Sequence, residues 1–132
     1  MHVFITGGTG FIGSAIIGEL LAAGHTVTGL ARTPEAAAKL GQAGVTPRPG
    51  ELTDLAGLRE AAAAADAVVH CAFIHDFSDY AGAARTDLHA VEAIIEGLAA
   101  AGPAAGKVLV TTSGTAGMKA GQVATETDAD DP

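Results

Sequence analysis

The chain begins with a glycine-rich motif, TGGTGFIG at residues 6–13, which lies between an apolar segment and an amphipathic one. Residues 2–6 have the composition of a buried strand, and residues 11–23 repeat apolar side chains at steps of four, as a helix does. Glycines let the backbone approach phosphates closely, and the helix that follows points its free N–H groups and partial positive charge at them. The motif therefore predicts a strand–turn–helix unit that binds the pyrophosphate of a dinucleotide, and not an ordinary turn.

Three glycines of this motif have distinct expected roles. Gly7 would permit the tight turn, Gly10 the close approach of the backbone to the pyrophosphate, and Gly13 the packing of the helix against the strand. The predicted cofactor-binding residues of the loop are Gly7, Thr9, Gly10, Phe11, Ile12 and Gly13.

Beyond the motif, short apolar segments alternate with longer helical patterns, which is typical of β-α units and a parallel sheet. The expected strands are residues 2–6, 26–30, 45–48, 67–71 and 107–111, and the expected helices are 11–23, 34–40, 54–65 and 79–101. Right-handed crossovers predict an α/β, doubly wound Rossmann sheet with strand order 3-2-1-4-5. Pro47 and Pro49 favour this order, because residues without an N–H are tolerated mainly on an edge strand.

Composition excludes several classes of protein. The chain has 7 basic and 15 acidic residues and a net charge of −8, which argues against a nucleic-acid partner. No apolar run approaches the ~18 residues of a membrane span, and no targeting segment precedes the first strand, so we expect no membrane association and a cytoplasmic location. A single cysteine, Cys71, excludes an internal disulfide and a cysteine-based zinc site; we interpret it as a small buried apolar residue.

The motif TGGTGFIG resembles the signature of the extended and atypical short-chain dehydrogenase/reductases, the NAD(P)-dependent epimerase/dehydratase group. Further markers follow in the family's order: GELTDL at residues 50–55, VHCAF at 69–73 and TTSGT at 111–115. The resemblance implies an NAD(P)-binding Rossmann domain at residues 1–120. Residues 121–132 would be an acidic loop or tail that leads to an absent C-terminal part carrying further strands and the substrate-binding region.

The resemblance also implies an activity, which is hydride transfer between the nicotinamide and a carbonyl or alcohol carbon of a small-molecule substrate. Reductase, epimerase and dehydratase chemistry all remain open, and the sequence does not name the substrate. The alternative is a non-catalytic NAD(P)-binding sensor or regulatory module of the same fold. A Tyr-x-x-x-Lys pair further along the gene would favour the enzyme.

The end of the second predicted strand indicates which cofactor binds. An Asp or Glu about 20 residues past the glycines binds the ribose 2′-OH of NAD, but here the segment is GLART, with Arg32 at that place. A guanidinium can pair with the 2′-phosphate of NADP, so we expect NADP in preference to NAD. The alternative is an exposed arginine at a strand end.

Further cofactor contacts are implied by the resemblance. Glu51 and Leu52 stand where the family has an Asp and an apolar residue beside the adenine, although a solvated loop acid is an equal alternative for Glu51. Ala72 would lie against the cofactor, and Phe73 would cover the crevice. The run AFIHDF at residues 72–77 is similar to one in some atypical reductases and would line the substrate pocket.

The catalytic residues implied by the resemblance are only partly present. Ser113 resembles the Ser or Thr that holds the substrate oxygen while a Tyr, assisted by a Lys, acts as general acid/base. A turn-capping hydroxyl is the alternative for Ser113, and Thr112 and Thr115 are backups for its role. The one tyrosine, Tyr80, has Ala84 at the position of the Lys and is interpreted as a packing residue. We therefore expect this chain to be inactive as it stands.

Two features of the second half have a bearing on ligands and partners. His75 and Asp76 follow the fourth strand, but two such groups make a poor metal site, so we expect no metal. The strand at residues 107–111 would form an exposed apolar edge, and such edges invite pairing with another chain. The sequence thus predicts self-association through the fifth strand.

Overall fold

The structure is a computed structural model that describes residues 1–76, 78–102, 105–114, 121, 123, 125, 127 and 128. Among the residues discussed above, Phe77, Thr115 and most of the acidic tail lie outside the described residues. Strands and helices alternate in the order β1 (His2–Thr6), α1 (Phe11–Ala22), β2 (Thr26–Ala31), α2 (Pro34–Gln42), β3 (Thr46–Pro49), α3 (Leu55–Ala64), β4 (Ala67–His70), α4 (Tyr80–Ala99) and β5 (Val108–Thr111).

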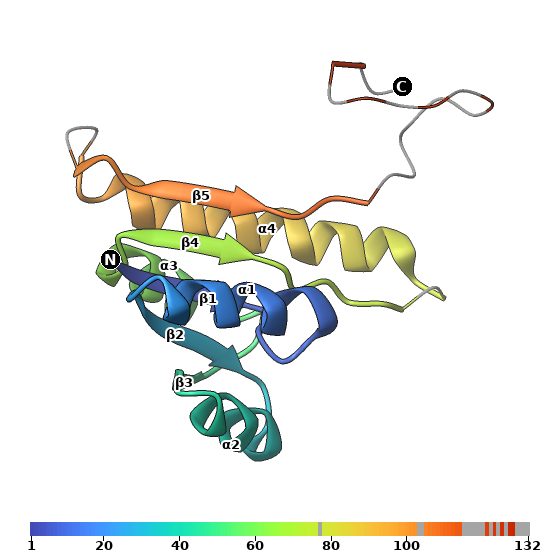
Figure 1. Ribbon diagram of the computed structural model, residues 1–132. Coiled ribbons are helices and arrows are strands. Elements are labelled where there is room, and N and C mark those ends of the chain that lie inside the picture. The colour runs from blue at the N-terminus through green and yellow to red at the C-terminus, as the bar shows by residue number, and fades with distance from the viewer. Residues whose placement is uncertain are drawn as a thin grey trace.

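The strands form one parallel sheet in the order β3-β2-β1-β4-β5, which confirms the predicted Rossmann topology (Figure 1). The central strand β1 pairs with β2 on one side and β4 on the other, so that Phe4 lies opposite both Thr28 and Val68. Strand β3 is at an edge, with Pro47 opposite Gly29. The edge position that Pro47 and Pro49 predict for this strand is therefore confirmed.

Helices cover both faces of the sheet, and β1 contributes side chains to both cores. Phe4 packs into the core beneath α3 and α4, whereas Val3 and Ile5 pack on the opposite face with residues of α1 and α2. Small residues let the layers approach closely. A Cβ added to Gly97 of α4 would lie 2.9 Å from the Cβ of Ala62 in α3, so this pair of helices packs almost backbone to backbone.

The predicted boundaries differ from the observed ones by one or two residues at several ends. The ends of α2 and α4 differ most: α2 continues to Gln42 instead of ending at Leu40, and α4 ends at Ala99 instead of Ala101. Val45 belongs to the buried core but precedes β3, because its N–H bonds the carbonyl of Leu40 and closes the turn after α2. The spacing of apolar residues does not predict a helix end that is set by a hydrogen-bonded turn of this kind.

No helix in the described part of the chain combines the length and the apolar character that crossing a membrane requires.

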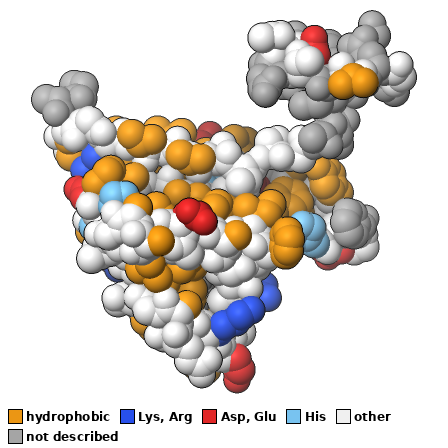
Figure 2. Space-filling model, viewed as in Figure 1, with side chains coloured by type: hydrophobic (Ala, Val, Ile, Leu, Met, Phe, Trp, Pro, Cys, Tyr) orange, Lys and Arg blue, Asp and Glu red, His pale blue; other side chains and the backbone are white. Residues whose placement is uncertain are grey.

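Strand β5 lies at the other edge of the sheet, with β4 as its one described neighbour. Its side chains Val108 and Val110 are 49% and 51% exposed, and Figure 2 shows hydrophobic side chains on the face of the molecule that carries this strand. Unpaired N–H and C=O groups beside exposed valines form a surface onto which another strand can add.

We therefore expect the 132-residue chain to self-associate in a concentration-dependent way. Sedimentation velocity over a range of concentrations measures this directly. Val110→Lys should shift the equilibrium toward the monomer, because a charge on an edge strand opposes pairing. Val123→Lys, at a residue that is 90% exposed and outside the sheet, is the matched control. A monomer at all concentrations would contradict the expectation.

Candidate dinucleotide-binding site

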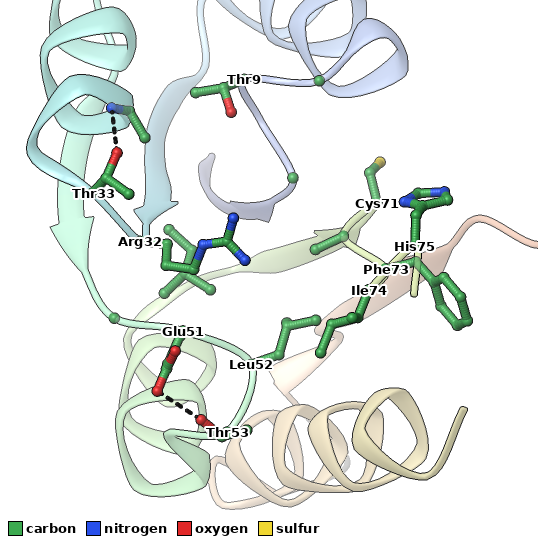
Figure 3. A pocket seen from close by; sticks show the side chains of 16 residues that line it. Thr9, Arg32, Thr33, Glu51, Leu52, Thr53, Cys71, Phe73, Ile74 and His75 are labelled. Carbon is green, nitrogen blue, oxygen red and sulfur yellow. Dashed lines mark hydrogen bonds between the residues drawn. The ribbon is translucent and has the colours of Figure 1, made fainter. Parts of the chain in front are cut away.

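A pocket of about 510 Å³ opens at the carboxyl edge of the sheet (Figure 3). The segments that follow β1, β2, β3 and β4 line it, which is the region where open parallel sheets bind ligands. The structure thus brings together residues that are distant in the sequence. The predicted cofactor residues in its lining are Gly7, Thr9, Gly10, Arg32, Glu51, Leu52, Ala72 and Phe73.

The turn after β1 has a geometry that only glycine fits at two positions. Gly7 has a φ of +70°, and a Cβ there would lie 2.7 Å from the backbone nitrogen of Ala72. A Cβ at Gly13 would overlap the carbonyl of Gly7. Gly10 differs, because its φ of −78° suits any residue and its added Cβ would lie 3.2 Å from the Gly7 oxygen. The fold itself thus requires Gly7 and Gly13 more strictly than Gly10.

Helix α1 begins at the pocket without a side-chain cap. Each of the other described helices is capped: Thr33 accepts from Ala36 N, Asp54 from Gly57 N and Asp79 from Gly82 N. The first turn of α1 contains no acidic residue either. Its N–H groups and the positive end of its dipole therefore face the pocket edge without a protein anion, an arrangement that suits a phosphate.

Two cations stand beside this loop. Arg32 follows β2 and its guanidinium points into the pocket in Figure 3, where it makes no hydrogen bond or ion pair with any described residue. Lys39, near the end of α2, donates from Nζ to the carbonyl oxygen of Thr9 at 3.0 Å. Sequence reasoning missed Lys39. The available clue was its position: Lys39 lies seven residues after Arg32, on the helix that follows the second strand.

The segment after β3 forms the floor of the pocket. Leu52 is buried in the core as well as lining the cavity, so it contributes an apolar wall. The carboxylate of Glu51 accepts a hydrogen bond of 2.9 Å from Thr53 Oγ1. Contact of Glu51 and Leu52 with the adenine stays a prediction.

The segment after β4 forms the opposite wall. The N–H of Ala72 donates to Thr6 Oγ1 at 3.2 Å, which holds this backbone against β1. The ring of Phe73 lies 5.6 Å from that of His75 in a T-shaped contact and 5.9 Å from that of Tyr80. Tyr80 therefore makes a packing contact, as expected, but at the surface, since 59% of it is exposed.

Cys71 is less buried than the small buried apolar residue that the sequence predicts. Strand β4 ends at His70, so Cys71 belongs to the loop and lies half-buried in the pocket lining. Burial raises the pKa of the Cys71 thiol, and a hydrogen bond with Thr112 opposes this shift in part. The thiol is thus held in its protonated, weakly nucleophilic form.

Other predicted residues lie outside the pocket lining. Phe11 and Ile12 are 95% and 53% exposed, and neither lines the pocket. Ser113 donates from Oγ to the carbonyl of Gly114 at 3.3 Å and is not part of the lining. The hydroxyl of Thr112, its first backup, donates to the His70 carbonyl.

The polar groups after β4 form local turns. Asp76 accepts hydrogen bonds from both the N–H and the hydroxyl of Ser78, and these bonds lower the pKa of its carboxyl group. Among the described residues, no three His, Cys, Asp or Glu side chains stand close enough together to hold a metal ion.

The environment of Cys71 predicts its reactivity. Because the thiolate is the nucleophile and burial raises the thiol pKa, we expect alkylation by iodoacetamide to be slower at pH 7 than for N-acetylcysteine. The midpoint of the pH–rate profile should also be higher. Cys71 is the single cysteine of the chain, so mass spectrometry reports on it alone, and the urea-unfolded chain serves as the control. A midpoint at or below that of the free thiol would show that the pocket does not desolvate Cys71.

Comparison with known proteins extends these observations. An uncharacterized protein of Schizosaccharomyces pombe is 47% identical over 127 residues, which cover 96% of this chain and 42% of that protein. Sterol-4-alpha-carboxylate 3-dehydrogenase, decarboxylating, of Dictyostelium discoideum is 45% identical over 71 residues, 54% of this chain and 22% of that protein. The chain therefore spans less than half the length of these relatives.

Solved structures show the same fold. UDP-glucose-4-epimerase from Stenotrophomonas maltophila, determined with bound NAD, has a TM-score of 0.76 and 23% identity over 98% of this chain and 42% of that chain. The model of the NAD dependent epimerase/dehydratase family matches residues 3–132. Since this match spans almost the whole sequence, the chain belongs to the NAD dependent epimerase/dehydratase family.

Proposed function

We propose that the chain is the NADP-binding part of an oxidoreductase that transfers hydride between the nicotinamide and a carbonyl or alcohol carbon of a small molecule. The observation that carries this proposal is that the uncapped start of α1 and the glycine turn meet Arg32 in one pocket, where Arg32 has no hydrogen-bond or ion-pair partner among the described residues. The arrangement suits a ligand with two separate phosphate groups, as in NADP. When bound, the nicotinamide would supply or accept the hydride.

The residues present fit such a cofactor. The N–H groups at the start of α1 would bind the pyrophosphate, and Gly10 would leave room for it. The guanidinium of Arg32 would bind the 2′-phosphate through paired hydrogen bonds. On the other side, Phe73 and Ile74 of the β4 segment would exclude water from the half of the pocket near Cys71.

The charges around the turn after β2 favour NADP in particular. No acidic residue stands in GLART at residues 29–33, so the ribose 2′-OH of NAD has no carboxylate partner there. Lys39 adds a second positive charge beside Thr9. Glu51 is the acid of the pocket lining, and its carboxylate is engaged by Thr53.

For the substrate side we propose Ser113 as the hydroxyl that holds the substrate oxygen, as the family resemblance implies. It follows β5 by one intervening residue, and so stands at the same edge of the sheet as the pocket. Its hydrogen bond to the Gly114 carbonyl would have to give way to the substrate. The 132-residue chain contains no Tyr-x-x-x-Lys pair, so we expect no steady-state oxidation of NADPH with small carbonyl compounds, followed by absorbance. Measurable turnover would contradict this expectation and show that the hydride transfer needs no such pair.

The cofactor preference is expected to depend on Arg32. In fluorescence titrations, Arg32→Ala should weaken the binding of NADPH by about 10- to 100-fold, because charge-assisted hydrogen bonds to the 2′-phosphate are lost. Binding of NADH should change little. Arg85→Ala, at an exposed position of α4, is the matched control and should affect neither ligand. Equal or tighter binding of NADH by the unmodified chain would refute the NADP assignment.

The phosphate position is tested at Gly10. Gly10→Val should abolish dinucleotide binding, because the side chain would occupy the space in front of the α1 N-terminus. The extended backbone at Gly10 suits a valine, but the Cβ would lie 3.2 Å from the Gly7 carbonyl oxygen, which must shift slightly. Circular dichroism therefore has to show that the variant is folded before its affinity is compared. Gly18→Val, at a position of α1 with no neighbour within 4 Å, is the control. Affinity that survives Gly10→Val would place the phosphates elsewhere.

A further inference from the structure

A chain of buried and partly buried hydrogen bonds joins β1, β4 and α4 behind the pocket. The side chain of His70, at the end of β4, is 3% exposed. Its Nδ1 lies 2.7 Å from Thr6 Oγ1 at the end of β1, and its Nε2 lies 3.0 Å from Asp87 Oδ1 in α4. Thr6 is fully buried, and its Oγ1 also accepts the N–H of Ala72 at 3.2 Å.

One arrangement of protons gives every atom of this chain a partner. The carboxylate of Asp87 only accepts, so Nε2 of His70 carries a proton and donates it. The hydroxyl of Thr6 accepts from Ala72 and has one proton to donate, which goes to Nδ1 of His70. A proton on Nδ1 instead would leave the Thr6 hydroxyl without an acceptor among the described residues. In this arrangement each group donates to the next, from the Ala72 N–H to Thr6, from Thr6 to His70 and from His70 to Asp87.

The Thr6 hydroxyl lies behind the close contact between the segments that follow β1 and β4. Thr6 immediately precedes Gly7, and the space between Gly7 and the Ala72 nitrogen would not admit even a Cβ, which would lie 2.7 Å away. Both Gly7 and Ala72 line the pocket, whereas Thr6, His70 and Asp87 do not. The hydroxyl thus sets the position of two pocket walls from behind.

The backbone of His70 extends the same connection to β5. Its carbonyl oxygen accepts the N–H and the hydroxyl of Thr112, both at 3.1 Å. The carboxyl ends of β1, β4 and β5 and one helix are therefore tied together at one residue. Packing alone does not require this, because apolar side chains of similar volume often stabilise a core as well as a buried polar network does.

We propose that Thr6, His70 and Asp87 are positioning residues of the dinucleotide site, through which α4 holds the glycine turn and Ala72 in their binding geometry. The inference rests on the proposed function, since it concerns affinity for the same cofactor. The hydrogen bonds of these three residues would then maintain the geometry that binds the cofactor, in addition to any contribution to the stability of the fold.

The chain offers a matched control in a second His–Thr pair. Nε2 of His2 lies 2.8 Å from Thr28 Oγ1, and this pair likewise joins side chains of β1 and β2 across the sheet. Neither His2 nor Thr28 lines the pocket. Removing the hydroxyl of Thr28 therefore measures the cost of losing a cross-strand His–Thr hydrogen bond away from the cofactor.

The experiment is a set of NADPH titrations on folded variants of the full chain, with urea unfolding measured in parallel. Thr6→Val keeps the side-chain shape and should weaken NADPH binding by about ten-fold, because the Ala72 N–H loses its acceptor. Thr6→Ser should restore the affinity. Thr28→Val should lower the stability without changing the affinity. Asp87→Ala should weaken binding several-fold, and Asp87→Asn, which keeps an acceptor, should not.

A double-mutant cycle provides the decisive test, because Thr6 and Asp87 are linked only through His70 in the described structure. The doubly substituted chain, with Thr6→Val and Asp87→Ala, should bind no more weakly than Thr6→Val alone. Independent, additive losses would overturn the inference, as would wild-type affinity in Thr6→Val. If Thr6→Val does not fold, Asp87→Ala and Asp87→Asn decide the matter by the same affinity criterion. If the unmodified chain binds no dinucleotide, both the proposed function and this inference fail. If the unmodified chain binds NADPH but the variants do not behave as described, the inference alone fails.

Discussion

The close contact between the turn after β1 and the segment after β4 is the constraint on which the rest of the site depends. At Gly7 the two backbones are so near that a single added carbon would collide with Cys71 and Ala72. This contact brings the glycine turn, the start of α1 and the β4 wall into one pocket. Besides the pairing of β1 with β4, a hydrogen bond from the N–H of Ala72 to the side chain of Thr6 holds the two segments together there.

The electrostatics of the pocket run against those of the whole molecule. The chain carries a net charge of −8, yet Arg32 lines the pocket beside an uncapped helix N-terminus, and Lys39 bonds the carbonyl of Thr9 in the lining. The acid of the lining, Glu51, is engaged by Thr53. A local positive field in an acidic protein selects anionic ligands at one place and repels polyanions elsewhere. This contrast is more informative than the net charge, and it is what a phosphate-bearing cofactor needs.

The structure accounts for the proposed cofactor contacts more fully than for the proposed contact with the substrate. The pocket is built from the segments after the first four strands, whereas Ser113 follows β5 and is bonded to its neighbour Gly114. The chain covers 42% of the length of its Schizosaccharomyces pombe relative. Within the described residues, the pocket is lined by the segments after the first four strands, and the hydrogen bonds of Thr6 and His70 join β1, β4 and β5 behind it.

Much of the fold and part of the site were predictable from local sequence patterns. The glycine motif, the alternation of strands and helices and the edge position of Pro47 follow from spacing and residue type, which act over a few residues. The strand order then placed Arg32 near the glycine turn. The sequence did not reveal that Lys39 bonds Thr9, that Cys71 lines the pocket, or that Ser113 lies outside its lining. Thr6 and His70 are 64 positions apart, and their hydrogen bond exists only because the register of β1 against β4 sets them side by side. Sequence periodicity determines which face of an element is buried, whereas the tertiary structure decides which distant side chains meet there, because that depends on the register and twist of the whole sheet.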